Sequence, residues 1–446
     1  MNGLTRNLAE FAASLEFRKI PAEAVATAKR GFIDCVGVMI AGRGEPVVQL
    51  LLNERLFSEK NEARILFDQG FSSSPDAALL NTTAGHALDY DDVAIDGHPS
   101  VVLVPAILAE GERLGASGAE LIAAYVAGYE VWAELASRDE DKFHPKGWHP
   151  SGVFGAVAAA AAGARLGKLD AARTAHAIAA AASMSAGLTA NFGSMMKPLQ
   201  VARAAQGGLI AARLAAKGFT ASPDALEHRG GFLKAFSPAG RVRTDATLGE
   251  WHILKNGLNI KRYPVCYALH RSIDGLLSLN LKNKIKHENV REIELSIGKL
   301  QAGMLRHSRP QNALDAKFSA EFAAASAVVA GRVGLAELSD GFVRSAPVQA
   351  LFEKVRISPV DDPHPDDPLF SRSDQVRVTL ADGTVLAGEP VTHAKGHAHN
   401  PLGMDELRLK FNDCVAGALA AGERDALFEK LRTLESLPLV AGLYPA

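Results

Sequence analysis

The chain has 446 residues, and 48 Lys and Arg against 50 Asp and Glu leave a formal net charge of −2. A nearly neutral chain offers no electrostatic attraction for nucleic acid or for an anionic membrane, so neither partner is expected. Its three cysteines, Cys35, Cys266 and Cys414, lie far apart, which argues against disulfides, structural zinc and iron–sulfur sites. Without an apolar signal segment at the N-terminus, a cytoplasmic protein of two or three domains is expected.

The first half of the chain is predicted to be helical. Pro21 stands at a helix start, and apolar residues recur after it at helical spacing until Gly42. Similar periodic stretches continue to about Lys217, with Gly, Pro and Asp turns between them. Ala-rich runs at 153–164 and 177–190 are interrupted before they reach bilayer length. Closely packed helices therefore explain these runs better than membrane spans do.

After about Asn259 the pattern becomes typical of strands. Apolar and polar residues alternate over 292–297 and again over 376–380. The second run leads into an Asp-Gly dipeptide at 382–383, which favours a tight hairpin, and Val385 begins the returning strand. This part of the chain is therefore predicted to contain a sheet.

One helix and one long loop are predicted between those strands. Asp315 can cap a helix that carries Phe318 and Phe322 on one face. The segment 361–374 is rich in proline and aspartate, which predicts an exposed loop. A helix packed beside strands indicates a small α+β domain.

The predicted fold class is mainly α with a smaller α+β domain. From Leu407 onward apolar residues recur at four-residue steps, so the C-terminal segment is expected to rejoin the helical domain. The large helical domain is then discontinuous, over 1–258 and 398–446, and the α+β domain covers 259–397.

Two His-Pro-Ser triplets, at 98–100 and 149–151, are the most informative local motif. A proline restricts the residue before it to extended geometry, so each histidine is expected at a chain corner with its ring projected rather than buried. The acidic run 89–92 precedes the first triplet. Such a run is more often a solvated face, and Ser and Pro often only start helices. Two imidazoles beside crowded carboxylates can nevertheless form an acid–base site, in which one carboxyl holds a proton.

Five ordered motifs carry a resemblance to a known family: His86-Ala-Leu-Asp-Tyr-Asp-Asp92, His98-Pro-Ser100, His149-Pro-Ser-Gly152, Gly193-Ser-Met-Met-Lys197, and Lys261-Arg-Tyr-Pro-Val-Cys266 followed by His270. Together they resemble the MmgE/PrpD family over nearly the full length. The resemblance implies a large helical domain, a smaller α+β domain and a homodimer. It also implies chemistry on a small polycarboxylate substrate without a metal or an organic cofactor.

The resemblance implies that Asp89, His98, His149, Lys197 and His270 line the active site. Reactions of this family pass through or near a carbanion beside a carboxylate. Such a reaction needs a base at the carbon acid and fixed positive charge where the enolate oxygens develop. His149 is the predicted base, because a helix N-terminus disfavours the imidazolium form. Lys197 is the opposing group, although an isolated lysine is usually a surface residue.

Four further residues are weaker candidates for substrate binding. Arg262 offers a fork for a carboxylate, and Tyr263 a supporting hydroxyl. The backbone at Gly193 and Ser194 could approach an anionic ligand. His270, on a probable helix, could equally be a core histidine.

The sequence predicts no metal site and no nucleotide cofactor. His393, His397 and His399 lie close together, but their spacing fits no strong zinc signature. The Gly-rich fingerprints of phosphate-binding loops are not found in the sequence.

Val93 stands where dehydratases and decarboxylases of the family often carry threonine. Valine cannot donate a proton or a hydrogen bond, which disfavours the loss of a hydroxide and also decarboxylase-type placement of the substrate, but leaves simple proton exchange possible. The favoured hypothesis is therefore epimerisation of an iminodisuccinate-like amino or imino polycarboxylate. Dehydration of the 2-methylcitrate type is the alternative. Decarboxylation of the cis-aconitate type and an inactive helical scaffold are less favoured.

Overall fold

The computed structural model describes residues 3–54, 57–65, 70–249, 251–365 and 368–443. The chain divides into two compact units: the helical unit of Met1–Asn259 with Met404–Ala446, and the α+β unit of Ile260–Gly403. The α+β unit extends beyond the predicted end at residue 397, because the turn there is tied back to its start. The N–H of Ile260 donates to the carbonyl of Gly396 at 2.8 Å, and the N–H of Gly396 donates to the carbonyl of Asn400 at 2.8 Å.

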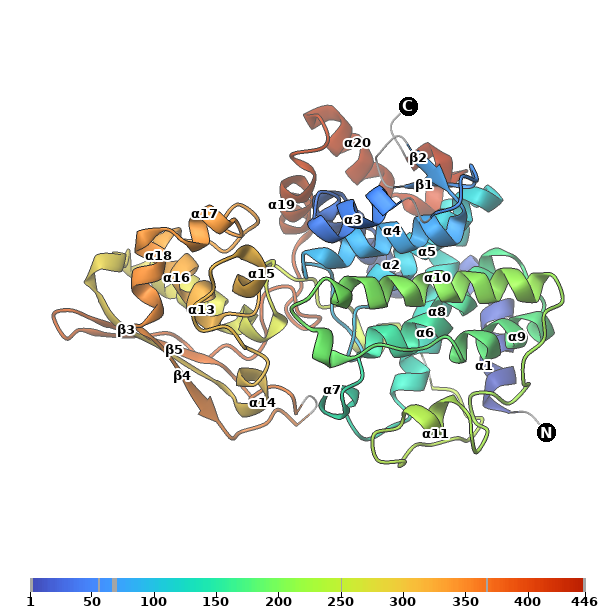
Figure 1. Ribbon diagram of the computed structural model, residues 1–446, viewed down its shortest axis with the longest axis horizontal. Coiled ribbons are helices and arrows are strands. Elements are labelled where there is room, and N and C mark those ends of the chain that lie inside the picture. The colour runs from blue at the N-terminus through green and yellow to red at the C-terminus, as the bar shows by residue number, and fades with distance from the viewer. Residues whose placement is uncertain (1–2, 55–56, 66–69, 250, 366–367, 444–446) are drawn as a thin grey trace. The chain divides into compact units, whose positions relative to one another are not determined.

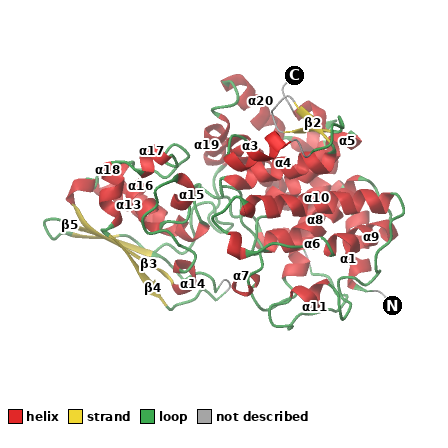
Figure 2. Ribbon diagram, in the orientation of Figure 1, coloured by secondary structure: helices red, strands yellow, loops and turns green. Residues whose placement is uncertain are grey.

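The helical unit is built almost entirely of helices, as predicted (Figures 1 and 2). Its elements are α1 (Leu4–Ser14), η1 (Phe17–Lys19), α2 (Ala22–Gly42), α3 (Pro46–Glu54), β1 (Ala63–Ile65), β2 (Gly70–Ser72), α4 (Ser74–Ala87), α5 (Pro99–Leu114), α6 (Gly118–Ala136), α7 (Phe143–Lys146), α8 (Pro150–Leu166), α9 (Ala171–Ala182), η2 (Thr189–Asn191), α10 (Met196–Ala216), α11 (Phe232–Phe236), α12 (His252–Asn256), α19 (Met404–Val415), α20 (Ala421–Arg432), η5 (Leu434–Ser436) and η6 (Val440–Leu443).

Small residues let the central helices approach one another closely. α10 packs against α8, α4 and α9, and a cluster of buried alanines fills the space between α8, α9 and α10. A Cβ added at Gly208 would lie 2.5 Å from the carbonyl oxygen of Ala156, so this helix crossing requires glycine. The Ala-rich sequence therefore sets the spacing of the helices on which the candidate site stands.

The helical unit also contains a small antiparallel ladder that the sequence did not predict. Strands β1 and β2 pair Ala63 with Ser72 and Ile65 with Gly70. Each strand has three residues, which is too short for an alternating pattern to be recognised. The prediction of an all-helical domain is corrected in this detail.

The C-terminal segment packs into the helical unit through a buried cation. Lys410 on α19 lies 2.5 Å from Asp34 on α2 and donates to the carbonyl of Tyr90 at 2.8 Å. Its ammonium group also lies 4.0 Å from the centroid of the Tyr90 ring. The last helices of the chain therefore hold the acidic loop that precedes the first His-Pro-Ser triplet.

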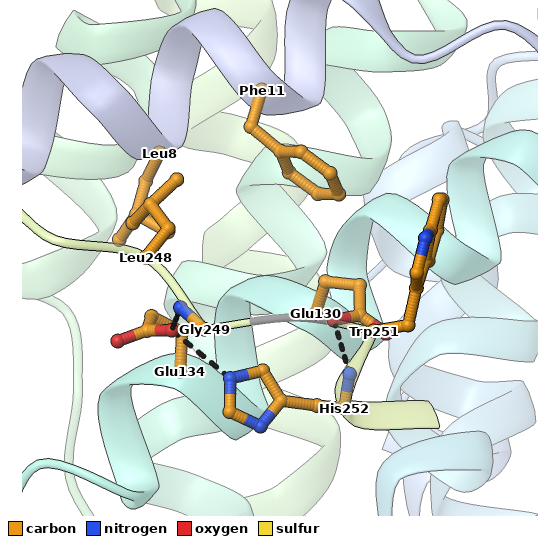
Figure 3. A pocket seen from close by; sticks show the side chains of 8 residues that line it. All are labelled: Leu8, Phe11, Glu130, Glu134, Leu248, Gly249, Trp251 and His252. Carbon is orange, nitrogen blue, oxygen red and sulfur yellow. Dashed lines mark hydrogen bonds and ion pairs between the residues drawn. The ribbon is translucent and has the colours of Figure 1, made fainter. Parts of the chain in front are cut away.

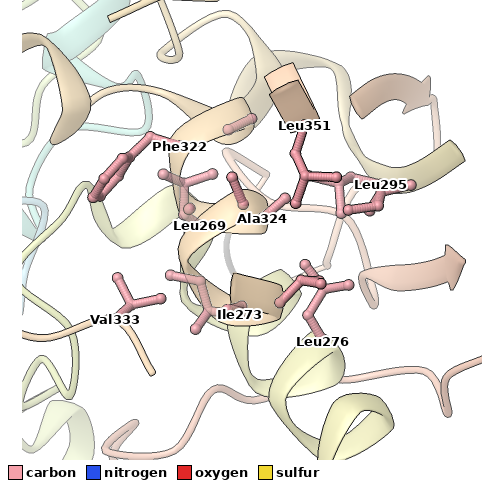
Figure 4. Close-up of a cluster of buried hydrophobic side chains, with 14 of the residues drawn as sticks. Leu269, Ile273, Leu276, Leu295, Phe322, Ala324, Val333 and Leu351 are labelled. Atoms are coloured by element: carbon pink, nitrogen blue, oxygen red, sulfur yellow. The ribbon is translucent and has the colours of Figure 1, made fainter. Parts of the chain in front are cut away.

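The α+β unit contains a four-stranded sheet with helices packed on it. Its elements are η3 (Tyr267–Leu269), α13 (His270–Asn283), η4 (His287–Asn289), β3 (Val290–Gly298), α14 (Lys299–Ala302), α15 (Ala313–Ala316), α16 (Ala320–Val329), α17 (Asp340–Val343), α18 (Ala346–Phe352), β4 (Val355–Val360), β5 (Gln375–Leu380) and β6 (Val385–Ala387). The strand order is β4-β3-β5-β6; the β3–β4 pair is parallel and the other two pairs are antiparallel. Leucine, isoleucine and phenylalanine side chains of α13, α16, α18 and β3 form the core (Figure 4).

Two of the predictions for this unit are confirmed and two need correction. β3 and the hairpin β5–β6 form where alternation predicted them, and Gly383 at the turn has φ +86°. β4 was missed, because Pro359 interrupts its pattern, and such a proline is tolerated at the sheet edge where β4 lies. Asp315 does not cap the Phe322 helix; Ser319 does, accepting from the N–H of Phe322 at 3.1 Å.

Within the described residues, no helix alone is both long and apolar enough to span a bilayer. The bent pair α2 and α3, which meet at 73°, passes that test only when taken together. Most of α2 is buried inside the helical unit, as the core helix of a folded domain would be.

Candidate active site

Four helix ends in the helical unit carry most of the predicted acid–base residues. α4 ends just before the acidic run, α5 and α8 begin after His98 and His149, and Lys197 lies in the first turn of α10. α10 packs against α4, α5 and α8, and α5 packs against α4 and α8. Helix packing thus brings together residues that are far apart in the sequence.

His98 and His149 lie at chain corners, as the triplets predict. Each is the residue before a helix, and Pro99 and Pro150 occupy the first helical positions. Neither ring is projected, however, because His149 is only 1% exposed and the His98 side chain 12%. Phe192 covers His149 with its ring centroid 4.8 Å away, so the prediction of projected rings is wrong.

Asp89 and Lys197 form a buried ion pair. Nζ of Lys197 lies 2.5 Å from Oδ1 of Asp89, and the two side chains are 7% and 6% exposed. Asp89 has φ +52°, a left-handed conformation that aspartate tolerates better than most residues and that recurs at functional sites. The ammonium group also lies 5.2 Å from the centroid of the Phe192 ring. The site therefore contains a positioned cation, able to meet a substrate carboxylate or a developing enolate.

Asp91 bridges two imidazoles. Its carboxylate oxygens lie 3.0 Å from Nδ1 of His86 and 2.9 Å from Nδ1 of His98. Burial acts to raise the pKa of Asp91, but the facing His86 and His98 outweigh it and hold that pKa well below the usual value. An ionised carboxylate favours the Nδ1–H tautomer of each ring, which leaves the lone pair on Nε2. The His98–Asp91 pair is therefore arranged as a general base.

The pKa of Asp92, the next residue, is shifted in the opposite direction. Burial raises its pKa well above the usual value, and the negative charges of Asp34 and Asp91 raise it further. The N–H of Ser100 donates to its carboxyl at 3.3 Å. Burial and the neighbouring carboxylates thus favour the protonated form of this carboxyl, which is the direction predicted for crowded carboxylates. The run is not a solvated face, because Asp89, Asp91 and Asp92 are all buried.

Gln200 fixes the tautomer of His149. The N–H of Leu188 donates to Oε1 of Gln200 at 3.1 Å, and Nε2 of Gln200 donates to the carbonyl of Leu188 at 3.2 Å. These two bonds determine which end of the amide faces the ring. The same Nε2 group donates to Nδ1 of His149 at 2.7 Å. Neutral His149 therefore carries its proton on Nε2.

This tautomer fits a hydrogen-bond donor better than the predicted base. The Nδ1 lone pair of His149 already accepts from Gln200. Burial lowers the pKa of His149 well below its usual value, and electrostatic interactions with His86 and Lys197 lower it further. A neutral imidazole whose proton is held on one nitrogen can donate it to negative charge that develops in a transition state.

Two family models match the chain: the MmgE/PrpD N-terminal domain over residues 6–245 and the MmgE/PrpD C-terminal domain over residues 263–434. The chain belongs to the MmgE/PrpD family. This agrees with the resemblance that the sequence motifs predict.

Several curated members of the MmgE/PrpD family are similar to this chain. The cis-aconitate decarboxylase of Mus musculus is 26% identical over 98% of this chain and 92% of its own length. The human cis-aconitate decarboxylase is 24% identical, covering 98% and 93%, and that of Aspergillus terreus is 26% identical, covering 98% of both chains. The similarity to these relatives therefore extends through both units.

Three residues of the site were not singled out from the sequence. His86 and Asp91 lie within the motif that carried the family resemblance, yet their pairing depends on the turn after α4. Gln200 lies three residues after Lys197 on α10, so helical spacing places both on one side of the helix. That spacing is the signal that could have identified Gln200.

Gly193 and Ser194 lie in the turn that leads into α10. Gly193 has φ +83°, a conformation that favours glycine. The Ser194 hydroxyl donates to the carbonyl of Asn191 at 2.8 Å and accepts from the N–H of Met196 at 3.3 Å. Both residues thus shape the turn that positions Lys197, and their contact with a substrate stays a prediction.

The remaining predicted residues belong to the α+β unit. His270 begins α13, is fully buried, and lies with Nε2 3.3 Å from the carbonyl of Val265. The hydroxyl of Tyr263 donates to Asp274 at 2.5 Å, and Arg262 lies 3.8 Å from the same carboxylate. These contacts give all three a structural role within this unit, and their part in catalysis stays a prediction.

The buried histidines and carboxylates have the spacing of a metal site. One ligand atom from each of His86, Asp89, Asp91 and His98 lies within 4.8 Å of the others. Both carboxylates already have partners within the cluster, however: the Lys197 ammonium lies at Asp89 and two imidazoles lie at Asp91. The arrangement suits proton transfer, and chemistry without a metal stays a prediction.

A separate cavity of about 390 Å³ lies elsewhere in the helical unit (Figure 3). Its apolar wall comes from Leu8, Phe11, Leu248 and Trp251, and its polar wall from Glu130, Glu134, Gly249 and His252. The N–H of Gly249 and Nε2 of His252 contact the Glu134 carboxylate. The predicted catalytic residues do not line this cavity.

Proposed function

We propose that this protein is a lyase that acts on a small polycarboxylate, and that decarboxylation of a tricarboxylate of the cis-aconitate type is the reaction its site fits best. The curated relatives named above are cis-aconitate decarboxylases that align along almost the whole chain. Similarity along nearly the full length of the chain supports a shared reaction class. The proposal replaces epimerisation as the favoured hypothesis.

The donor tautomer of His149 is the observation that carries this proposal. Decarboxylation breaks the carbon–carbon bond to the departing CO₂ and leaves the electron pair on carbon, where a conjugated carboxylate delocalises it. The site must then stabilise an enolate and deliver one proton to carbon. Lys197 is a cation close to Asp89, and His149 presents a proton held on Nε2 by Gln200. Both groups are donors, which is what this half of the reaction requires.

Val93 is compatible with decarboxylation. Its backbone pairs with Asn259, donating and accepting at 2.9 Å, and its side chain has no hydroxyl. A dehydratase must protonate the departing hydroxide, whereas a decarboxylase releases CO₂ without such a proton. The residue that disfavours dehydration therefore leaves decarboxylation possible.

Epimerisation is the second candidate, because the His98–Asp91 pair is arranged as a base. An epimerase removes a proton α to a carboxylate and returns one to the other face. His98 and the donor His149 have ring centroids 6.5 Å apart, so a base and a donor are present in one cluster. An iminodisuccinate-like substrate would use both.

Proton NMR in deuterated water distinguishes these reactions. The protein is incubated with cis-aconitate, 2-methylcitrate or iminodisuccinate stereoisomers, together with the Lys197→Ala variant and, as a control, His228→Ala, an exchange at a histidine outside the site. Loss of CO₂ from cis-aconitate with one deuterium in the product supports the proposal. Deuterium at the α-carbon with interconversion of stereoisomers and no CO₂ supports epimerisation instead. Equal turnover by the native chain and Lys197→Ala would refute the assigned site.

A further inference from the structure

Four histidines gather in the α+β unit. His393, His397 and His399 lie on one loop, with ring centroids 4.5, 5.2 and 5.3 Å apart. His364 comes from the earlier loop after β4, and its ring centroid is 6.1 Å from that of His393. The sequence spacing of the first three fits no zinc signature, and the fourth ring is brought in only by the fold.

The ring separations match those of imidazoles around one metal ion. A metal–nitrogen bond of about 2.0–2.1 Å and a tetrahedral angle place the centres of two bound imidazoles about 5 Å apart. The three separations within the 393–399 loop are close to this value. Imidazole nitrogens are ligands that suit Zn²⁺, Ni²⁺ and Cu²⁺.

The loop that carries three of the rings is held by its own backbone. The N–H of His397 donates to the carbonyl of Ala394 at 3.0 Å, and the N–H of Asn400 donates back to the carbonyl of His397 at 2.8 Å. Gly396 has φ +96°, and a Cβ there would lie 2.0 Å from the carbonyl oxygen of Ile260. The rings therefore stand on a backbone whose position is fixed before any ligand binds.

Arg271 ties the two histidine-bearing loops together. Its Nη1 group donates to the carbonyl of Ser371 at 2.8 Å and to that of Thr392 at 3.2 Å. The N–H of His364 donates to the carbonyl of Phe370 at 2.8 Å, next to the first of these contacts. Arg271 is paired with Asp374 at 2.7 Å, which compensates its charge near a bound cation.

The rings need a small rearrangement to share one ion. Among the described residues, the active-site cluster is the group whose possible ligand atoms already lie within 4.8 Å of one another. The imidazoles of the four-histidine cluster must therefore turn before their nitrogens can share one ion. Nδ1 of His397 accepts from the N–H of His399 at 3.0 Å, and ligation through Nε2 gives up that bond.

We propose that His393, His397 and His399, with His364 as the fourth ligand, bind one divalent transition-metal ion such as Zn²⁺ or Ni²⁺. The ion joins the loop after β4 to the loop at 393–399. This is a structural site in the α+β unit, and it does not depend on the function proposed for the helical unit.

Isothermal titration of the full-length chain with Zn²⁺ tests this proposal. The chain is first treated with a chelator, and the titration is done in the His98→Gln variant, which removes one of the four possible ligands of the active-site cluster. One site of micromolar or tighter affinity is expected. When His393→Ala and His397→Ala are both added to this variant, the affinity for Zn²⁺ should weaken at least tenfold. The control is His287→Ala, at a histidine elsewhere in the same unit, and it should leave the affinity unchanged.

Two outcomes overturn the proposal. One is the absence of Zn²⁺ binding by the native cluster, and the other is equal affinity in the double variant. Because an unfolded double variant would also lose binding, the single variant of the half-buried His364, His364→Ala, is measured beside it. It should weaken binding by a smaller factor, with an unchanged melting temperature in chelator. Substitution by Co²⁺ adds a visible absorption spectrum that reports tetrahedral coordination, and an octahedral spectrum counts against the four-histidine site.

Discussion

Replacing Gln200 by glutamate is expected to reverse the tautomer of His149. A carboxylate cannot donate to Nδ1, where the amide now donates at 2.7 Å. It accepts from Nδ1–H instead, and a hydrogen bond to a charged group contributes about 1.5–3 kcal/mol. Since about 1.4 kcal/mol is tenfold in an equilibrium, the Nδ1–H form should dominate by at least about tenfold. The proton on Nε2, which we assign to the transition state, is then lost.

The expected effect on turnover follows from the loss of one positioned donor. Removing such a donor costs about 10²–10³-fold in kcat, or about 2.7–4 kcal/mol. KM should change little, because the lost interaction is made in the transition state. The new carboxylate also favours the imidazolium, so the pKa of His149 should rise from its lowered value and kcat should gain a pH dependence from this group.

Steady-state kinetics with the substrate identified by NMR, together with ¹⁵N shifts of the His149 ring nitrogens, test this reasoning. The matched control is Gln206→Glu, which also introduces a carboxylate at a buried glutamine of α10 but one that contacts Asp76 and Arg203. Gln206→Glu should retain most of the activity. Native-like kcat in Gln200→Glu, with the nitrogen shifts showing the reversed tautomer, would refute the donor role of His149.

Three further predictions concern the buried charges. Lys197→Met should lower the free energy of unfolding by about 3–5 kcal/mol, because the Asp89 carboxylate loses its buried partner, and adding Asp89→Asn should recover part of this loss in chemical denaturation. Because the pKa of Asp92 is raised in the folded state, its contribution to stability is present at low pH and is lost as the pH rises through that pKa. Asp92→Asn should therefore flatten the alkaline side of the curve of unfolding free energy against pH. An unchanged curve would contradict the assignment. Lys410→Met should destabilise by a similar amount as Lys197→Met, and the double variant with Asp34→Asn should be milder than Lys410→Met alone, as measured by melting temperature.

Local sequence determined many of the helices and the main hairpin. Pro21 directly precedes α2, and the prolines of the two triplets occupy the first positions of α5 and α8, where a proline loses no helical hydrogen bond. Gly383 closes the β5–β6 hairpin because glycine takes the positive φ that the turn requires. These features depend on residues a few positions apart, so they can be read without the fold. The ordered motifs likewise identified the family.

Elements that depend on distant partners could not be predicted in this way. The edge strand β4 exists because β3 is beside it, and the cap of α16 falls on Ser319 rather than Asp315 because the chain turns there after a separate short helix. The contact between Gln200 and His149 requires α8 and α10 to pack together with the Leu188 loop between them. The sequence offered the residues but not their pairing.

The neighbouring aspartates of the acidic run show the difference most directly. Asp91 and Asp92 are the same residue type at adjacent positions, and both are buried. His86 and His98 face Asp91 and lower its pKa, whereas burial beside Asp34 raises that of Asp92. The sequence by itself determined that carboxylates and imidazoles would be close here. Only the tertiary structure decided in which direction each pKa is shifted, because a pKa depends on the solvent a group loses and on the charges that packing places around it.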